Sequence, residues 1–172
     1  MVDTLLAIAS RRDERGTLPE PLSPELSLRL LDAGRLSGSA GNGQPWTFVV
    51  PTGRSRVEEL AGAVFVPENV LGAGLVIAIL VAGKGPLSFD AGRAAQSMLL
   101  VAWAEGLASC PNGIADLDAA RRALDATENE TPVIVLSFGF PAKPRDPNVR
   151  SAAEWSERAN RKPLGDVVRW VS

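Results

Sequence analysis

The chain has 172 residues, of which 45% are hydrophobic and 22% charged, as in an ordinary soluble globular domain. Its formal net charge of −2 argues against nucleic acid as the main partner, because phosphate backbones recruit basic protein faces. A single cysteine excludes an internal disulfide framework and is typical of a reducing compartment, so we expect a cytoplasmic protein.

The first third of the chain predicts two helices and a strand. Apolar residues recur at helical spacing over 2–12, and Gly16 is a natural stop beyond them. Ser23 before Pro24 is a strong helix start, and we expect this second helix to run to about Gly34. A loop of small and amide residues, "GSAGNGQPW", then leads into the strand "WTFVV".

The middle of the chain predicts two more helices around a strand. "SRVEELAG" (55–62) is typical of a surface helix capped by Ser55. "LVIAILVA" (75–82) predicts a strand buried on both faces, and the apolar run around it is too short to cross a membrane. The longest predicted helix is 88–107, capped by Ser88 and ended by Gly106, and its alanines indicate central packing.

The last third predicts two strands, two helices and an arm. "GLASCPNGI" (106–114) indicates a short strand that breaks into a Pro-Asn-Gly turn, and 116–126 is an amphipathic helix. "PVIVLSFGFP" (132–141) predicts a third buried strand, and 141–163 an extended, charged arm with a last helix. Strands separated by helices predict one α+β or α/β domain of three layers over 1–172.

The chain contains no histidine and no tyrosine, which narrows its chemistry. Ser-His-Asp triads, histidine metal sites and the commonest general base are therefore excluded. Without a histidine to activate it, Cys110 is interpreted as a buried structural thiol and not as a nucleophile. An enzyme built from these residues would depend on a cofactor, and redox chemistry asks least of the side chains.

Four segments carry groups that could bind a ligand. "RRDER" (11–15) offers guanidinium forks for a phosphate, or is a solvated cluster neutralised by nearby acids. In "GSAGNGQPW" small residues would let a ring approach the backbone and amides could read a uracil-like edge; the alternative is a helix cap and turn. The Pro-Asn-Gly segment could aim backbone N–H groups at a ligand or be only a turn, and "ERANRKPL" (157–164) is most simply a solvated face.

The order of these segments is more specific than any one of them. "RRDER", "GSAGNGQPWTFVV", "D-x-G-x-A-x-Q-x-x-x-L-x-A-x-x-x-G-L" (90–107), "PNGI", "FGFP" and "R-K-P-L" follow one another along the chain. This series resembles the FMN-dependent nitroreductase family over nearly the whole sequence, and Asn-x-Gln-Pro-Trp is its most specific part. The resemblance implies a three-layer α/β/α sandwich with a mixed, mostly antiparallel sheet, in an intertwined homodimer with FMN at the interface.

The resemblance also implies a function. Members of the family transfer hydride from NAD(P)H through flavin N5, by a ping-pong mechanism, to nitroaromatics, quinones or other small acceptors. The flavin carries the chemistry, so no catalytic side chain, no metal, and neither nucleic acid nor a membrane as partner is expected. The alternatives are a flavin- or deazaflavin-binding or flavin-modifying protein of the same fold, and a dimeric module that has lost FMN.

The family's cofactor site maps onto matching positions of this chain. The FMN phosphate would be held by Arg11, Arg12, Arg15 and Arg161, with Asp13 among them. The loop of small residues would line the flavin from the partner subunit through Gly38, Ser39, Ala40 and Asn42. Asn69 would lie over the pyrimidine edge of the ring, and the backbone N–H groups of the segment Pro111, Asn112 and Gly113 would face the ring near N5. The arm at 141–163 would pack on the partner.

Three departures from the family pattern stand out. Asp13 replaces a serine that often contacts the phosphate, and so adds repulsion unless a neighbouring arginine neutralises it. Gly38 replaces a proline, which predicts a looser loop. The connection 82–88 is too short for the helical lid of many relatives, which predicts an open site.

Overall fold

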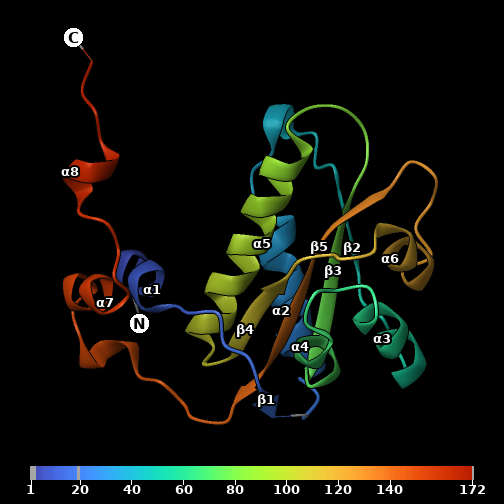
Figure 1. The fold of residues 1–172 in the computed structure, drawn as a ribbon, viewed down its shortest axis with the longest axis horizontal. Coiled ribbons are helices and arrows are strands. Elements are labelled where there is room, and N and C mark those ends of the chain that lie inside the picture. The colour runs from blue at the N-terminus through green and yellow to red at the C-terminus, as the bar shows by residue number, and fades with distance from the viewer. Residues whose placement is uncertain (1–2, 19, 172) are drawn as a thin grey trace. The chain divides into compact units, whose positions relative to one another are not determined.

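The computed structural model describes residues 3–18 and 20–171, and these residues divide into two compact units. The first unit, 12–144, contains the whole β-sheet, and we call it the sheet unit. The second unit, which we call the terminal unit, combines the described residues of 1–11 with those of 145–172. Figure 1 labels the elements of both units, and each unit is described by itself.

The sheet contains five strands, and every described strand pair is antiparallel. The strand order is β1-β5-β3-β2, and β4 pairs with β5 off this path. The strands are β1 (Thr17–Leu18), β2 (Trp46–Val49), β3 (Leu75–Val81), β4 (Ala108–Asn112) and β5 (Thr131–Pro141). The predicted α+β class is confirmed, and the parallel pairing of a mixed sheet does not occur among the described strands.

Alternate residues of β3 enter two different cores, which explains why this strand is apolar throughout. Ile77 and Ile79 belong to the core that includes residues of α2 and α5, whereas Ala78 and Leu80 belong to the core that includes residues of α3, α4 and α6. Helices therefore cover both faces of the sheet, as Figure 1 shows, and the three predicted layers are present. The helices are α2 (Pro24–Arg35), α3 (Arg54–Ala61), α4 (Pro67–Leu71), α5 (Leu87–Ala104) and α6 (Leu117–Ala123).

The helix starts predicted from the sequence are confirmed only in part. Ser23 is the N-cap of α2, and its hydroxyl accepts the Leu26 N–H at 3.3 Å. α3 and α5 each begin one residue earlier than predicted, so Ser55 and Ser88 lie inside the helices and cap neither. The N-cap of α3 is Gly53, whose φ of 84° is a conformation that glycine adopts at little cost. The helix therefore begins at a glycine turn, without a hydrogen bond from a capping side chain.

The terminal unit is a small helical assembly. α1 (Thr4–Ser10) packs against α7 (Ala152–Arg158) and the 3-10 helix η2 (Pro147–Val149), and α8 (Leu164–Val167) follows along the chain. Trp155 is buried, and its Nε1–H donates to the Pro147 carbonyl at 2.9 Å. The predicted arm at 141–163 therefore contains η2 and α7, and it is less extended than its prolines indicate.

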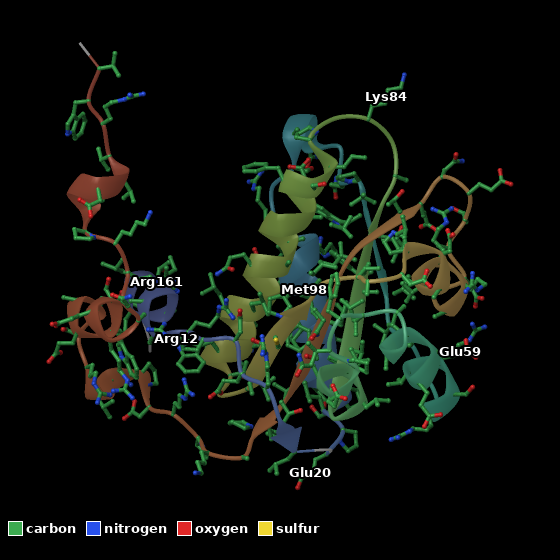
Figure 2. All side chains as sticks on the ribbon, in the orientation of Figure 1. Arg12, Glu20, Glu59, Lys84, Met98 and Arg161 are labelled. Atoms are coloured by element: carbon green, nitrogen blue, oxygen red, sulfur yellow. The ribbon has the colours of Figure 1, made fainter. Side chains whose placement is uncertain are left out.

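The connection between β3 and α5 is as short as predicted. It consists of residues 82–86 and holds no helix, and Lys84 extends from it in Figure 2. Within 3–18 and 20–171, no helix is both long and apolar enough to cross a membrane. The same residues contain no cluster of three or more His, Cys, Asp or Glu side chains arranged to hold a metal ion.

Candidate flavin site

The first component of the candidate site is the loop 39–44, which includes the 3-10 helix η1 (Ala40–Asn42). Asn42 and Gln44 both have positive φ angles, of 56° and 47°. The loop holds itself in shape, because the Gln44 N–H donates to Ser39 Oγ at 2.8 Å and the Asn42 N–H donates to the Ser39 carbonyl at 3.0 Å. Residues 40–44 are exposed, so the loop presents backbone and short side chains to a neighbouring molecule.

Two charged residues of α5 lie against the start of this loop. Asp90 is only 2% exposed, and its two carboxylate oxygens accept the Ala40 N–H at 3.2 and 3.1 Å. The Arg93 guanidinium lies 3.9 Å from the Asp90 carboxylate and covers Gly38, where a Cβ atom would collide with it. The colliding atoms are the tip of a flexible side chain, so Arg93 would have to move if Gly38 carried a side chain, and the expectation of a looser loop stays a prediction.

The second component is β4, which differs from the predicted Pro-Asn-Gly turn. Pro111 and Asn112 continue the strand opposite Leu136 and Val135 of β5, and only Gly113 lies beyond its end. A proline fits there because β4 pairs with β5 alone among the described strands, and edge strands tolerate a missing N–H. The turn prediction was wrong because local Pro and Gly signals carry no information about the partner strand.

Asn69 and Asn112 are brought together by side-chain hydrogen bonds. Asn112 is 4% exposed, and its Oδ1 accepts from Asn69 Nδ2 at 2.9 Å. Asn112 Nδ2 lies 3.1 Å from the Cys110 carbonyl, 3.2 Å from the Val135 carbonyl and 3.1 Å from Ser137 Oγ. The Asn112 side chain is thus turned into the protein, whereas the sequence suggested only a role for its backbone.

The predicted arginine cluster is divided between the two units. Arg12, Asp13 and Arg15 belong to the sheet unit, where the Glu14 N–H donates to the Ser109 carbonyl of β4 at 3.0 Å. Arg15 is exposed, and Arg12 and Asp13 each have an interaction partner. The segment that carries these groups therefore runs beside β4.

Arg11 and Arg161 belong to the terminal unit. Arg11 is the C-cap of α1, and its N–H donates to the Ala7 carbonyl at 3.0 Å. Arg161 follows the end of α7 and is exposed, and its N–H donates to the Ser156 carbonyl at 3.1 Å. Since α1 packs against α7, the two arginines follow the ends of neighbouring helices of one unit; Figure 2 labels Arg161.

Asp90 and Arg93 were not assigned a role from the sequence. Asp90 opens the series "D-x-G-x-A-x-Q", but a helix pattern alone does not reveal which backbone N–H its carboxylate accepts. A sequence signal that could have indicated a role for Asp90 is its position as the acidic residue in the first turn of a largely apolar helix. A carboxylate buried in such a helix requires a hydrogen-bond partner.

These groups fit a flavin mononucleotide by their chemistry. The loop 39–44 offers a surface without large side chains, which a planar ring requires for close contact. Among the described residues, none donates a hydrogen bond to Asn69 Oδ1, so this oxygen remains available to an imide N–H of a ligand. Arg15 and Arg161 are exposed cations of the type that binds a phosphate monoester.

Comparisons with known proteins identify the family of the chain. The model of the "Nitroreductase family" matches residues 8–77 and 87–140. A curated relative from Methanothermobacter thermautotrophicus, named "Putative NADH dehydrogenase/NAD(P)H nitroreductase", is 28% identical over 83% of this chain and 79% of its own length.

Solved structures share the fold over almost the entire chain. A nitroreductase family protein from Clostridium difficile 630 superposes with a TM-score of 0.81 at 21% identity, covering 99% of both chains. An FMN-dependent nitroreductase from Clostridium difficile R20291 superposes with a TM-score of 0.74 at 19% identity, covering 88% of this chain and 96% of that one. Because the family model spans well over half of the sequence, the chain belongs to the nitroreductase family.

Proposed function

We propose that the protein is an FMN-dependent oxidoreductase that takes hydride from NADH or NADPH and reduces a small acceptor such as a nitroaromatic or a quinone. The observation that carries this proposal is the family match over 8–77 and 87–140. The match contains every candidate cofactor residue except Arg161. The names of the relatives support the donor, and the FMN-dependent structural neighbour supports the cofactor.

The residues of the chain would bind and orient the cofactor. FMN, when bound, supplies the hydride chemistry that a protein without histidine or tyrosine is poorly equipped to provide. The guanidinium groups of Arg11, Arg12, Arg15 and Arg161 would offset the phosphate charge of about −1.5 to −2. The loop 39–44 would exclude water from one side of the ring, held in place by the buried Asp90 carboxylate.

Anaerobic reduction tests this proposal. Purified protein is loaded with FMN, freed of excess cofactor and mixed with NADH or NADPH while the flavin absorbance is recorded. We expect one of the two nicotinamides to bleach the bound flavin, and a later addition of a quinone or nitroaromatic to restore the colour. Protein that takes up no FMN, or that keeps its colour with both donors, contradicts the proposal.

A second candidate function is favoured by Asp13. This carboxylate stands among the arginines in sequence, where its negative charge would offset part of their attraction for a phosphate. A protein that binds flavin or deazaflavin without reacting with nicotinamides, or that modifies flavin, would tolerate weaker binding. Bound flavin that neither nicotinamide reduces is the result that selects this second function.

We also propose a homodimer with the flavin at its interface. The terminal unit leaves large apolar side chains in solvent: Leu5, Ile8, Leu164, Val167, Trp170 and Val171 are between 54% and 92% exposed. Side chains of this size are enriched where a second chain covers them.

Light scattering after size-exclusion chromatography tests the dimer. We expect a dimer for the native chain and a shift toward monomer for Trp170→Ser, since Trp170 is 92% exposed and large. Leu117→Ser is the matched control, because Leu117 is 45% exposed on α6 of the sheet unit. A monomeric native chain, or equal behaviour of the two variants, contradicts this assignment.

A further inference from the structure

The hydrogen bonds of Asn112 determine which way round its carboxamide lies. Asn112 Nδ2 faces two backbone carbonyls, of Cys110 and Val135, at 3.1 and 3.2 Å. A carbonyl can only accept, so an amide oxygen in the same place would meet two acceptors and lose both hydrogen bonds. The Ser137 hydroxyl donates its proton to the Cys110 carbonyl at 3.2 Å. It therefore acts as an acceptor toward Asn112 Nδ2, which lies 3.1 Å from Ser137 Oγ.

The orientation of Asn112 in turn determines that of Asn69. With Asn112 Nδ2 directed at the backbone, Asn112 Oδ1 is left to face Asn69 and requires a donor. Asn69 Nδ2 provides it at 2.9 Å, and the same nitrogen lies 3.8 Å from Cys110 Sγ. Both amide hydrogens of Asn69 are therefore directed at the protein, and its Oδ1 is the group left to a ligand.

This arrangement has a consequence for ligand recognition. A surface asparagine can rotate its amide and offer either a donor or an acceptor at the same point. Rotation of Asn69 would place its Oδ1 against Asn112 Oδ1, which costs the hydrogen bond and leaves a buried acceptor unpaired. The pair therefore selects a ligand edge that carries an N–H group and disfavours an edge that carries only acceptors.

We propose that Asn112 is a positioning residue, which holds the Asn69 carboxamide so that Oδ1 accepts a hydrogen bond from the imide N–H of a bound flavin ring. The inference rests on the proposed function, because it takes the ligand to be FMN. What it adds is that the Asn112 side chain fixes the direction of this hydrogen bond, with Asn69 as the acceptor and the ligand as the donor. Deazaflavin carries the same imide group, so the assignment holds for either ring.

A protein–ligand double-mutant cycle tests the hydrogen bond. FMN and its N3-methylated analogue, which lacks the imide N–H, are titrated against the native protein and Asn69→Leu. We expect methylation to weaken binding to the native protein by about 2- to 10-fold more than to the variant, as for a single hydrogen bond. The steric cost of the methyl group against the rest of the site is present in both proteins and cancels in the cycle, so the difference reports on its contact with residue 69.

The positioning role of Asn112 needs a readout that a structural role would not change. The exchange rate of the imide proton of bound, ¹⁵N-labelled FMN is such a readout, measured by NMR. We expect slow exchange in the native protein and faster exchange in both Asn69→Leu and Asn112→Ala, although the latter retains Asn69. Ser137→Ala is the matched control, because it removes one acceptor and leaves both carbonyls to orient Asn112, so exchange stays slow.

The possible outcomes separate this inference from the proposed function. If the native protein binds no FMN, the proposed function fails first. If FMN binds but methylation affects the native protein and Asn69→Leu equally, the inference is overturned while the proposed function stands. If Asn112→Ala does not fold, the cycle on Asn69 still decides whether the acceptor is used, and exchange in Ser137→Ala that is as fast as in Asn69→Leu overturns the role of Asn112.

Discussion

The sheet unit and the terminal unit differ in how completely they bury their own apolar residues. In the sheet unit, the central residues Ile77, Ile79 and Phe138 are fully buried in the core that includes residues of α2 and α5. In the terminal unit Trp155 is buried, whereas Trp170 and Val171 are 92% and 85% exposed. The first unit also exposes large apolar side chains, such as Phe65 at 73% and Phe89 at 66%, but it surrounds a fully buried core, whereas most of the large apolar side chains of the second unit lie in solvent. Under the proposed homodimer, the partner chain would cover apolar surface of this kind.

The residues proposed to bind the cofactor also differ between the two units in how firmly the protein holds them. The Asn69–Asn112 pair and the Asp90 carboxylate are held by hydrogen bonds within the sheet unit. Arg11 and Arg161 lie on the terminal unit, at the ends of helices, and Arg161 is exposed. In the proposed site, ring contacts would therefore depend on a prearranged framework, whereas phosphate contacts would require ordering of long side chains, which costs conformational entropy.

The largest effect is expected from Phe138→Ala in the sheet unit. Phe138 is fully buried in β5, and removing its ring leaves a cavity, so the free energy of unfolding should fall by about 3–5 kcal/mol. Urea unfolding followed by circular dichroism measures this change. A loss below about 1 kcal/mol would contradict the claim that this unit depends on its own tightly packed core.

A smaller effect is expected from Asp90→Ala, in the same unit. The substitution leaves the Ala40 N–H without its acceptor and the Arg93 guanidinium without its nearest carboxylate, at a cost of about 1–3 kcal/mol. Hydrogen exchange should accelerate at Ala40 and through the loop 39–44. Asp118→Ala, which removes an exposed carboxylate of α6, is the control and should leave this loop unchanged.

In the terminal unit, Trp155→Phe should act weakly and locally. It keeps a ring in the same place but removes the Nε1–H that donates to the Pro147 carbonyl, a loss of about 1 kcal/mol. We expect faster hydrogen exchange in α1 and α7 with little change in β3 and β5. An equal acceleration in the strands would mean that the two units do not differ as described.

The smallest effect concerns pH. The backbone N–H of Thr127 donates to Glu130 at 3.0 Å and lowers the pKa of this carboxyl group below its usual value. Because the pKa is lower in the folded state, the stabilisation is present above the unfolded-state pKa and is lost as the pH falls through the folded-state pKa. Native protein should therefore melt slightly higher than Glu130→Gln at neutral pH, and the difference should vanish in acid. A difference that grows in acid would contradict this sign.

The sequence predicts the sheet unit better than the site. Continuous aliphatic runs such as 75–82 indicate buried strands reliably, because both faces of β3 meet a core. Helix starts at Ser55 and Ser88 were misplaced because turn geometry at Gly53 and Pro86 begins those helices without a side-chain cap. The family resemblance was confirmed by the match over 8–77 and 87–140.

For the candidate site, the sequence predicts a set of residues but not the hydrogen bonds that connect them, and their contact with a cofactor stays a prediction. Asn69 and Asn112 are 43 positions apart, and only the pairing of β4 with β5 shows that Asn112 turns inward toward Ser137. The Arg93 guanidinium over Gly38 is likewise a long-range contact. Such contacts depend on strand register and helix placement, which local patterns do not specify.

The phosphate assignment is the central claim, and the ratio of FMN to riboflavin affinity tests it most directly, because the two ligands differ only in the phosphate. Titration of native protein, Arg11→Ala, Arg161→Ala and the control Arg122→Ala, which removes an exposed arginine of α6, gives this ratio for each. We predict that native protein and the control prefer FMN strongly, and that each of the other variants loses about 10-fold or more of that preference, as for a charge-assisted contact. Equal affinity of the native protein for both ligands, or an unchanged ratio in Arg11→Ala and Arg161→Ala, would contradict the account.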